Sequence, residues 1–227
     1  MADVFGQSIE QLELLGYQQG EQVYPRAIAD NKPRKLRFTF PDIPSELATL
    51  NDEGFNIYFV VNGWGDTDEE VKTCKAIFYE HDDRPKEDQI YLWESFGLPE
   101  PTFQVETGGK SIHSYWVFDE PIASDLWKPL QTDLLNFSDA DRTTKNESRV
   151  MRLAGFRHHK KGVASDVASI VSKSGKRYSY DLLRSIVPLT PKVTAKSKSK
   201  KKLKDTTPTS FTRVTVTSWP KLNVTSA

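Results

Sequence analysis

A short apolar run that ends in acids, Ala76 to Asp83 (AIFYEHDD), constrains this chain more than any other stretch. Ala76 to Tyr79 has the β-forming residues of a buried strand, and an acidic segment follows at its carboxyl end. Because side chains alternate faces along an extended segment, Glu80 and Asp82 point the same way. Two carboxylates on one side of a strand end suit Mg²⁺ or Mn²⁺, although a solvated acidic turn has the same pattern.

Length and composition narrow the class of protein. A chain of 227 residues can bury one substantial core. No apolar run approaches the ~18 residues of a membrane-spanning helix, and the acidic N-terminal segment lacks the basic start of a signal peptide. The single cysteine, Cys74, excludes an internal disulfide and is typical of a reducing compartment. We therefore expect a cytoplasmic protein with no membrane partner.

The formal net charge of zero conceals two oppositely charged parts. After Pro191 the chain has nine basic residues and one acid, so 22 of the 31 basic and 30 of the 31 acidic residues precede it. An acidic body with a basic tail is typical of a protein that approaches a polyanion through its tail. A low-complexity run such as KSKSKKKLK is equally typical of a solvating terminus. We predict a catalytic domain over residues 1–190 and a basic linker and tail over residues 191–227.

Hydrophobic periodicity predicts both helices and strands before that tail. The expected helices are 7–15, 46–50, 86–97, 125–137 (with Ser124 or Asp125 as N-cap) and 180–186. The expected strands are 35–40, 56–62, 76–79, 102–106, 112–118, 148–156 and 167–171. Strands 102–106 and 112–118 flank a glycine turn and form a hairpin that Pro121 ends.

The glycine turn of this hairpin, TGGKS, is a candidate phosphate site. It is not a Walker A loop, because Gln104 stands where that motif needs its first glycine and a strand, not a helix, follows. Its exposed backbone N–H groups can still hold a phosphate together with Lys110, Ser111 and His113. Ser111 and His113 lie two residues apart and face the same way on a strand, although a packed, hydrogen-bonded histidine would fit the same position.

A third polar segment, DADRTTKNESRVMRLAGF, follows the predicted helix 125–137. Asp139 or Asp141 could supply a third carboxylate, and Arg149 and Arg152 are suited to bind phosphate, whereas a charged surface loop explains the segment taken alone. Carboxylates, a Ser-x-His pair and arginines are together the parts of a nucleotidyl-transfer site. The basic residues that follow are candidates for DNA binding: Arg157, His158, Lys160 and Lys161.

The order and spacing of these motifs resemble the archaeo-eukaryotic primase superfamily, most closely its plasmid- and phage-borne branch of RepB-like primase and primase-polymerase domains. The similarity covers residues 47–162 and includes LNDEGFNIYFVVN, AIFYEHDD followed by Gln89, LPEPTFQVETGGKSIHSYWVFDEPI and DADRTTKNESRVMRLAGFRHHKKG. Two positions depart from the family pattern. Glu80 stands where the superfamily more often has Asp, and Ala154 replaces the usual Pro of an RLPG segment, but neither change removes a functional group.

The resemblance implies an α/β (α+β) fold: an RRM-like antiparallel sheet with helices on one face, and a smaller α/β unit packed beside it. It also implies a metal-dependent nucleotidyltransferase that synthesises RNA or DNA primers from nucleoside triphosphates on a single-stranded DNA template. Such enzymes act in the replication of prokaryotic plasmids, phages or other mobile elements. Relatives often carry a helicase after the primase domain, so the resemblance also implies a possible helicase partner.

By the same resemblance, Glu80, Asp82 and Asp141 bind two Mg²⁺ or Mn²⁺ ions and act in catalysis with His113, which contacts the phosphates of the nucleotide. Asp141 is favoured over Asp139 because in relatives the third acid lies eight residues before the arginine of SRVMRL. We infer that Lys110, Ser111, Arg149 and Arg152 assist nucleotide binding. Two alternatives remain open: a catalytically inactive, replication-associated DNA-binding module, and a metal-dependent nuclease that uses the same acids.

Overall fold

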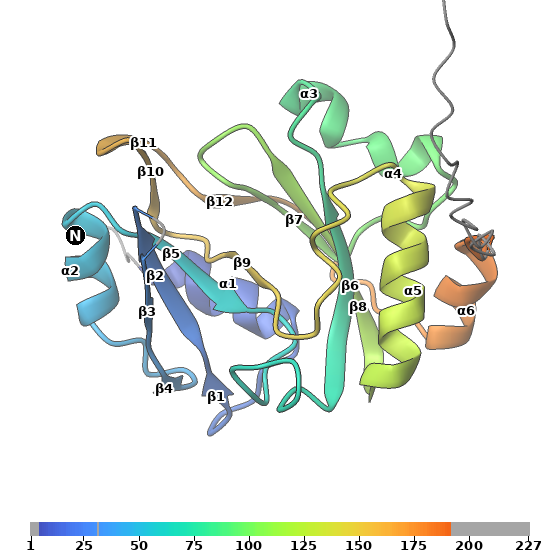
Figure 1. The fold of residues 1–227 in the computed structure, drawn as a ribbon, viewed down its shortest axis with the longest axis horizontal. Coiled ribbons are helices and arrows are strands. Elements are labelled where there is room, and N and C mark those ends of the chain that lie inside the picture. Colours follow the sequence, from blue (N-terminus) through green and yellow to red (C-terminus); the bar gives the residue numbers. More distant parts are fainter. Residues whose placement is uncertain (1–4, 31, 192–227) are drawn as a thin grey trace, which may run out of the picture. The chain divides into compact units, whose positions relative to one another are not determined.

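Two four-stranded antiparallel sheets form the framework of the molecule in the computed structural model, which describes residues 5–30 and 32–191 (Figure 1). The first sheet has the order β12-β7-β8-β6 and the second β3-β2-β5-β9. The strands of the first are β6 (Thr73–Glu80), β7 (Phe103–Glu106), β8 (Ile112–Ala123) and β12 (Ser169–Lys173). Those of the second are β2 (Pro25–Ala29), β3 (Lys32–Lys35), β5 (Asn56–Val60) and β9 (Val150–Arg152).

Two smaller strand pairs and six helices complete the described part of the chain. The pairs are β1 (Gln22–Val23) with β4 (Phe38–Thr39), and β10 (Arg157–Lys160) with β11 (Val163–Val167). The helices are α1 (Gly6–Leu14), α2 (Glu46–Asp52), α3 (Lys86–Gln89), α4 (Leu92–Ser95), α5 (Ser124–Phe137) and α6 (Tyr180–Ile186). None of the helices within residues 5–30 and 32–191 is long and apolar enough to cross a bilayer.

The pairing of β6 with β8 places the first acidic residue opposite the hairpin histidine. The six residues of β6 from Cys74 to Tyr79 are all buried, as the β-forming, apolar character of Ala76 to Tyr79 predicts, and they include the charged Lys75. The antiparallel register sets Phe78 opposite Tyr115 and Glu80 opposite His113. The carboxyl end of β6 and the start of β8 therefore meet at one point of the sheet.

Helix α5 packs against β6 and β8 beside this point (Figure 1). Its apolar face buries Trp127, Leu130 and Leu134, and the indole N–H of Trp127 donates to the carbonyl of Ala76 at 2.7 Å. Gln131 donates to the carbonyl of Phe78 and accepts from its N–H, at 2.7 and 3.1 Å. These bonds tie the helix to the backbone of β6 and so fix the strand that carries Glu80.

Most predicted elements are confirmed, among them the strand before Glu80, the hairpin around the glycine turn, and the helix at 180–186. The expected α+β class with antiparallel sheets is confirmed as well. Strands β1, β2, β10 and β11 were not predicted, and the predicted strand 35–40 is wrong. Its first residue ends β3, and Phe38 and Thr39 form β4 and pair with β1.

Several other predicted boundaries are also wrong. The strand predicted at 148–156 is shortened to β9, and the one predicted at 167–171 falls across the end of β11 and the start of β12. The single helix 86–97 is two short helices, because the backbone leaves the helical region at Tyr91, which has φ −111° and ψ 7°. Strand 112–118 runs on through Pro121 to Ala123, since this end of β8 still pairs with the start of β6. Ala123, in extended conformation and without a side-chain cap, therefore takes the N-cap position of α5.

Candidate active site

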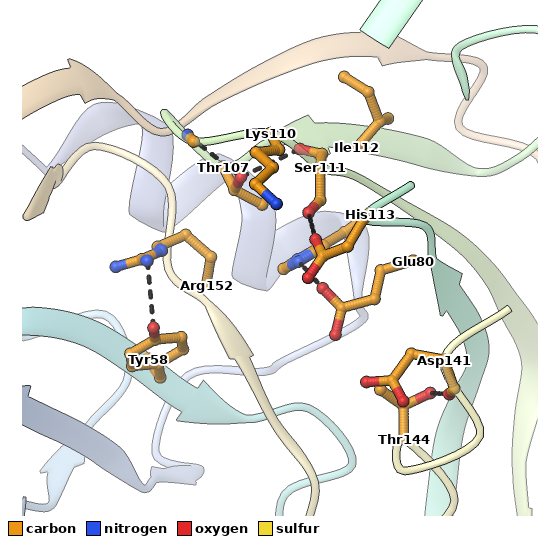
Figure 2. Close-up of polar contacts among 12 residues, drawn as sticks. Tyr58, Glu80, Thr107, Lys110, Ser111, Ile112, His113, Asp141, Thr144 and Arg152 are labelled. Atoms are coloured by element: carbon orange, nitrogen blue, oxygen red, sulfur yellow. Dashed lines mark hydrogen bonds and ion pairs between the residues drawn. The ribbon is translucent and has the colours of Figure 1, made fainter. Parts of the chain in front are cut away.

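A cavity of about 640 Å³ opens at the carboxyl end of β6. Its wall is built from both sheets, the glycine turn and the β10–β11 hairpin. The lining residues are Asn56, Tyr58, Glu80, Asp82, Thr107, Gly108, Gly109, Lys110, Ser111, His113, Arg152, His158, His159, Lys160 and Ser165. Figure 2 shows Glu80 with His113 on one side of the site and Arg152 with Tyr58 on the other.

Glu80 is the most strongly perturbed acid of the cavity. Its carboxylate lies 2.9 Å from Nε2 of His113 and 3.5 Å from Nη2 of Arg149. Burial alone would raise the pKa of Glu80, but the charge and hydrogen bond of His113, with a further contribution from Arg149, outweigh it and lower the pKa to about 2. Glu80 is therefore an ionised carboxylate throughout the neutral range.

Asp82 is held on the same side of the cavity by the glycine turn. The hydroxyl of Ser111 donates a short hydrogen bond to its carboxylate. Gln89, which is buried, donates to the carbonyls of Arg84 and Lys110 at 2.7 and 3.0 Å and accepts from the N–H of Ile112 at 2.7 Å. This one side chain thus fastens the loop that carries Asp82 to the turn that carries Ser111.

Asp141 lies beside the cavity rather than in its wall. Its backbone N–H donates to the carbonyl of Glu80 at 3.2 Å, and its carboxylate accepts from the N–H and hydroxyl of Thr143 at 2.9 and 2.7 Å. Nη2 of Arg149 is 3.9 Å from this carboxylate. Arg149 therefore lies between the carboxylates of Glu80 and Asp141.

Arg152 forms the opposite wall. Its guanidinium is buried and stacks on the ring of Tyr58, 4.3 Å from the ring centroid. It donates to Oδ1 of Asn56 at 2.8 Å, to the hydroxyl of Tyr58 at 3.1 Å and to Nδ1 of His158 at 2.7 Å. Because Arg can only donate, Nδ1 of His158 is the acceptor, and burial followed by the charge of Arg152 lowers the pKa of that ring.

The β10–β11 hairpin closes the cavity over the glycine turn. The hydroxyl of Ser165 donates to the carbonyl of Gly108 at 2.9 Å. Gly108 has φ +71°, and a Cβ there would lie 2.2 Å from the carbonyl oxygen of Asp166. No side chain fits at this position, so glycine is required for the hairpin to approach the turn.

Most of the predicted site residues meet at the cavity. Its wall includes Glu80, Asp82, Lys110, Ser111, His113, Arg152, His158 and Lys160. Asp141 and Arg149 contact Glu80 without lining the cavity. Arg157 is exposed outside it on β10, and Lys161 lines a separate hollow with Asp30 and Asp52.

Five lining residues were not predicted: Asn56, Tyr58, Thr107, His159 and Ser165. Asn56 and Tyr58 lie two residues apart on β5, so their side chains face the same way. This alternation is the one sequence feature that could have indicated that both line the same surface. The alternation identifies the cavity wall only once the strand register is known, because that register sets Tyr58 opposite Arg152.

The donor set at the carboxyl end of β6 is compatible with a divalent cation. Glu80 and Asp82 present carboxylate oxygens to one cavity, and these are the ligands that Mg²⁺ and Mn²⁺ prefer. Within residues 5–30 and 32–191, however, no group of three His, Cys, Asp or Glu side chains is already arranged to hold a metal ion. The third carboxylate, Asp141, is separated from the other two by its pairing with Arg149 and Thr143.

The sequence matches no protein-family model, and no curated protein matches it either. Among solved structures, the chain is 38% identical to the AEP domain of the cyanophage S-2L primase-polymerase, covering 80% of this chain and 97% of that one, with a TM-score of 0.71. Primase RepB′ is 17% identical over 81% of this chain and 62% of that one, with a TM-score of 0.63. The RepB′ catalytic domain, solved in complex with initiator DNA, is 18% identical over 79% and 92%, with a TM-score of 0.61.

The two RepB′ structures share the fold at low identity, whereas the S-2L domain matches in sequence over nearly its whole length. The predicted superfamily is therefore confirmed: the chain belongs to the archaeo-eukaryotic primase superfamily as a primase-polymerase domain, and is a nucleotidyltransferase with a priming role in mobile-element replication.

Proposed function

We propose that the cavity binds a nucleoside triphosphate and that the enzyme joins nucleotides into a primer on a single-stranded DNA template. The observation that carries this proposal is the division of the cavity into two charged halves. Glu80 and Asp82 form an anionic half, and Lys110, Arg152 and Lys160 supply the cationic half. A triphosphate needs both, because its charge is neutralised by cationic side chains and by metal ions held on carboxylates.

The residues of the glycine turn and β8 contact the phosphates in this proposal. Lys110 is exposed at the cavity, and the backbone N–H groups of the turn lie beside it. His113 lines the same space, with Nε2 bonded to Glu80 and Nδ1 3.4 Å from the hydroxyl of Tyr115, so it would donate to a phosphate oxygen by exchanging its bond to Glu80. Arg152 contributes a fixed guanidinium from the opposite wall.

Glu80 and Asp82 would hold the divalent cations, with Asp141 joining them when Arg149 turns from the carboxylates toward the nucleotide. When bound, two such ions stabilise the charge on the attacking and leaving oxygens of phosphoryl transfer. The chain's own contribution is the fixed carboxylate pair. Ser111 orients Asp82, His113 keeps Glu80 ionised, and Gln89 holds the two segments together.

The template strand would enter along the basic hairpin β10–β11, which carries the predicted DNA-binding residues Arg157, His158, Lys160 and Lys161. The RepB′ catalytic domain with the same fold was solved with initiator DNA. The nine basic residues after Pro191 would add affinity that depends on salt. These residues lie outside the described part of the chain, and the division at 190/191 stays a prediction.

Primer synthesis by two pairs of matched variants tests the proposal. The purified chain is incubated with single-stranded DNA, labelled nucleotides and Mn²⁺, and the products are separated by length. Asp82→Asn should abolish synthesis, whereas Asp83→Asn, whose side chain is 77% exposed, should retain it. Asp141→Asn should likewise abolish synthesis, and Asp139→Asn should not, because Asp139 points to Arg142 at 2.7 Å.

Each outcome of this assay bears on a specific assignment. Full activity of Asp82→Asn or Asp141→Asn overturns the role of that carboxylate. Shortening of the labelled strand in place of extension would identify the nuclease. DNA binding that survives with neither extension nor cleavage by the unaltered chain would identify the inactive binding module.

A further inference from the structure

Trp64 is an exposed aromatic side chain in an unusual backbone conformation, outside the cavity. Its side chain is 53% exposed, and its φ of +62° lies in the left-handed region. A bulky aromatic residue rarely adopts that region, and the conformation costs about 1–3 kcal/mol unless its surroundings impose it. Backbone preference therefore does not account for a tryptophan at this position, and about half of its surface is left open to solvent.

The surroundings of Trp64 hold its ring in one orientation. Gly63 precedes it with φ +68°, and a Cβ there would lie 2.7 Å from the hydroxyl of Tyr17. Nζ of the buried Lys75 lies 5.3 Å from the centre of the indole and 4.5 Å from the ring of Tyr17. The ammonium group of Lys75 and the constrained turn at Gly63 hold the indole in one orientation, while more than half of the surface of Trp64 stays open.

A hollow of about 620 Å³ lies against Trp64 and is bordered by a basic edge strand. β3 is exposed at all four positions and, with the residues after it, contributes Lys32, Arg34, Lys35 and Arg37. Lys35 and Arg37 line the hollow, and the guanidinium of Arg37 lies 5.9 Å from the ring of Tyr24. No acid of the described residues forms an ion pair with Arg37, so its charge is available to a ligand.

Two acids border the same hollow, and both are already engaged. Asp66 pairs with Arg26 and with Lys35, the latter at 2.7 Å. Glu70 accepts from the N–H groups of Asp66 and Thr67 at 2.7 and 3.1 Å. These acids organise the loop that presents Trp64. The hollow thus offers an open aromatic face beside the accessible guanidinium of Arg37 and beside Lys35, whose side chain stays 57% exposed while it pairs with Asp66.

We propose that the Trp64 surface, made of Tyr24, Lys35, Arg37 and Trp64, is a second contact site for single-stranded nucleic acid. A base stacks on the open face of the indole, and the neighbouring phosphates lie against Lys35 and Arg37. Aromatic platforms beside basic side chains are the general means of binding a single strand without reading its sequence. Stacking is tolerant of sequence because every base has a π-face.

The position of the surface fits one strand that reaches both sites. Lys75, which contacts Trp64, and Glu80, which lines the cavity, lie on the same strand β6, five residues or about 17 Å apart along it. A single strand of a few nucleotides spans that length. The inference thus extends the proposed function by adding a contact for the template strand outside the cavity.

Binding of a fluorescently labelled oligothymidylate to the full chain, without nucleotide or metal, tests the surface. Trp64→Ala should weaken binding about five- to a hundredfold, and Trp64→Phe should restore most of the affinity. Trp64→Asn should weaken it as Ala does, although Asn adopts the left-handed region more readily and so preserves the turn. Tyr91→Ala is the matched control, because Tyr91 is 65% exposed and lines neither hollow.

Salt dependence separates the two kinds of interaction. Replacing Lys35 and Arg37 by Gln should reduce the slope of log affinity against log salt by about one for each phosphate that these side chains no longer neutralise, whereas Trp64→Ala should lower affinity at an unchanged slope. Unchanged affinity of Trp64→Ala, or an equal decrease in Tyr91→Ala, overturns the proposal. Because Asp82→Asn leaves this surface intact, failure here and failure of the cavity assignment give different results.

Discussion

The two four-stranded sheets contribute opposite halves of the cavity, and each does so from one strand pair. In β6–β8, Glu80 faces His113, so an acid meets a base. In β5–β9, Tyr58 faces Arg152, so an aromatic ring supports a guanidinium. In the proposed function, the first pair would place charges at the reacting phosphate, and the second would fix a cation that holds the nucleotide. We therefore expect substitutions in the first to lower kcat and those in the second to raise KM.

Among the variants that compare the two strand pairs, the largest effect is expected for His113→Gln in the first sheet. Gln can still hydrogen-bond Glu80 but has no titratable proton and no charge. We expect kcat to fall about 10²- to 10³-fold with a smaller change in KM, because the group acts where charge develops. Steady-state primer extension measures both constants, and thermal melting checks the fold. A kcat within about threefold of the original value would remove His113 from the catalytic half.

The second prediction concerns acid stability and the same strand pair. The pKa of Glu80 is lowered to about 2, so the folded state binds the proton less readily than the unfolded chain. The stability from this carboxylate is fully present above its ordinary pKa of 4.5 and is lost as pH falls toward 2. We expect the stability that Glu80 contributes, up to about 3 kcal/mol, to vanish over this range.

Urea unfolding of the unaltered chain and of Glu80→Gln, at several pH values from neutral down to about 2, measures that contribution. The stability difference between the two proteins should shrink as the pH falls. Asp83→Asn, on the exposed neighbour, should show no such convergence. A constant difference between Glu80→Gln and the unaltered chain would show that the ion pair does not stabilise the fold.

The third prediction tests what holds the acidic half together. Gln89→Leu removes the three hydrogen bonds of a buried side chain, to the N–H of Ile112 and to the carbonyls of Arg84 and Lys110. We expect a decrease of about 2 kcal/mol in the free energy of unfolding and a lower kcat, since the loop of Asp82 is no longer fixed. Gln18→Leu is the matched control, because Gln18 is exposed and makes one long bond of 3.4 Å to Gly16. Equal stabilities of the two variants would contradict this role.

The smallest effect is expected in the second sheet. Arg152→Lys keeps a positive charge but cannot reproduce the bonds to Asn56, Tyr58 and His158 or the stacked geometry. We expect KM for the nucleotide to rise about tenfold, with kcat nearly unchanged. Arg157→Lys, on the exposed hairpin, should leave KM as it is. A fall in kcat as large as that of His113→Gln would contradict the hypothesis that the first sheet acts in catalysis and the second in nucleotide binding.

Local pattern was enough to predict the half of the site that belongs to one sheet. The apolar run before Glu80, the glycine turn and the alternation of Ser111 with His113 are features of neighbouring residues. Backbone geometry converts such short-range patterns directly into strands and turns. The roles of Glu80, Asp82 and Asp141 in binding metal remain predictions that the variants above address.

The amino-acid order alone was therefore sufficient to predict strand β6, the β7–β8 hairpin, helix α6 and the superfamily to which the chain belongs. The folded molecule was needed to show that Tyr58 meets Arg152, that Arg149 reaches both Glu80 and Asp141, and that Trp64 stands open beside Arg37. This is because pairing between strands nearly a hundred residues apart depends on how their faces pack in a common core. The spacing of residues along the chain does not indicate how those faces pack, so these contacts could not be predicted from the sequence.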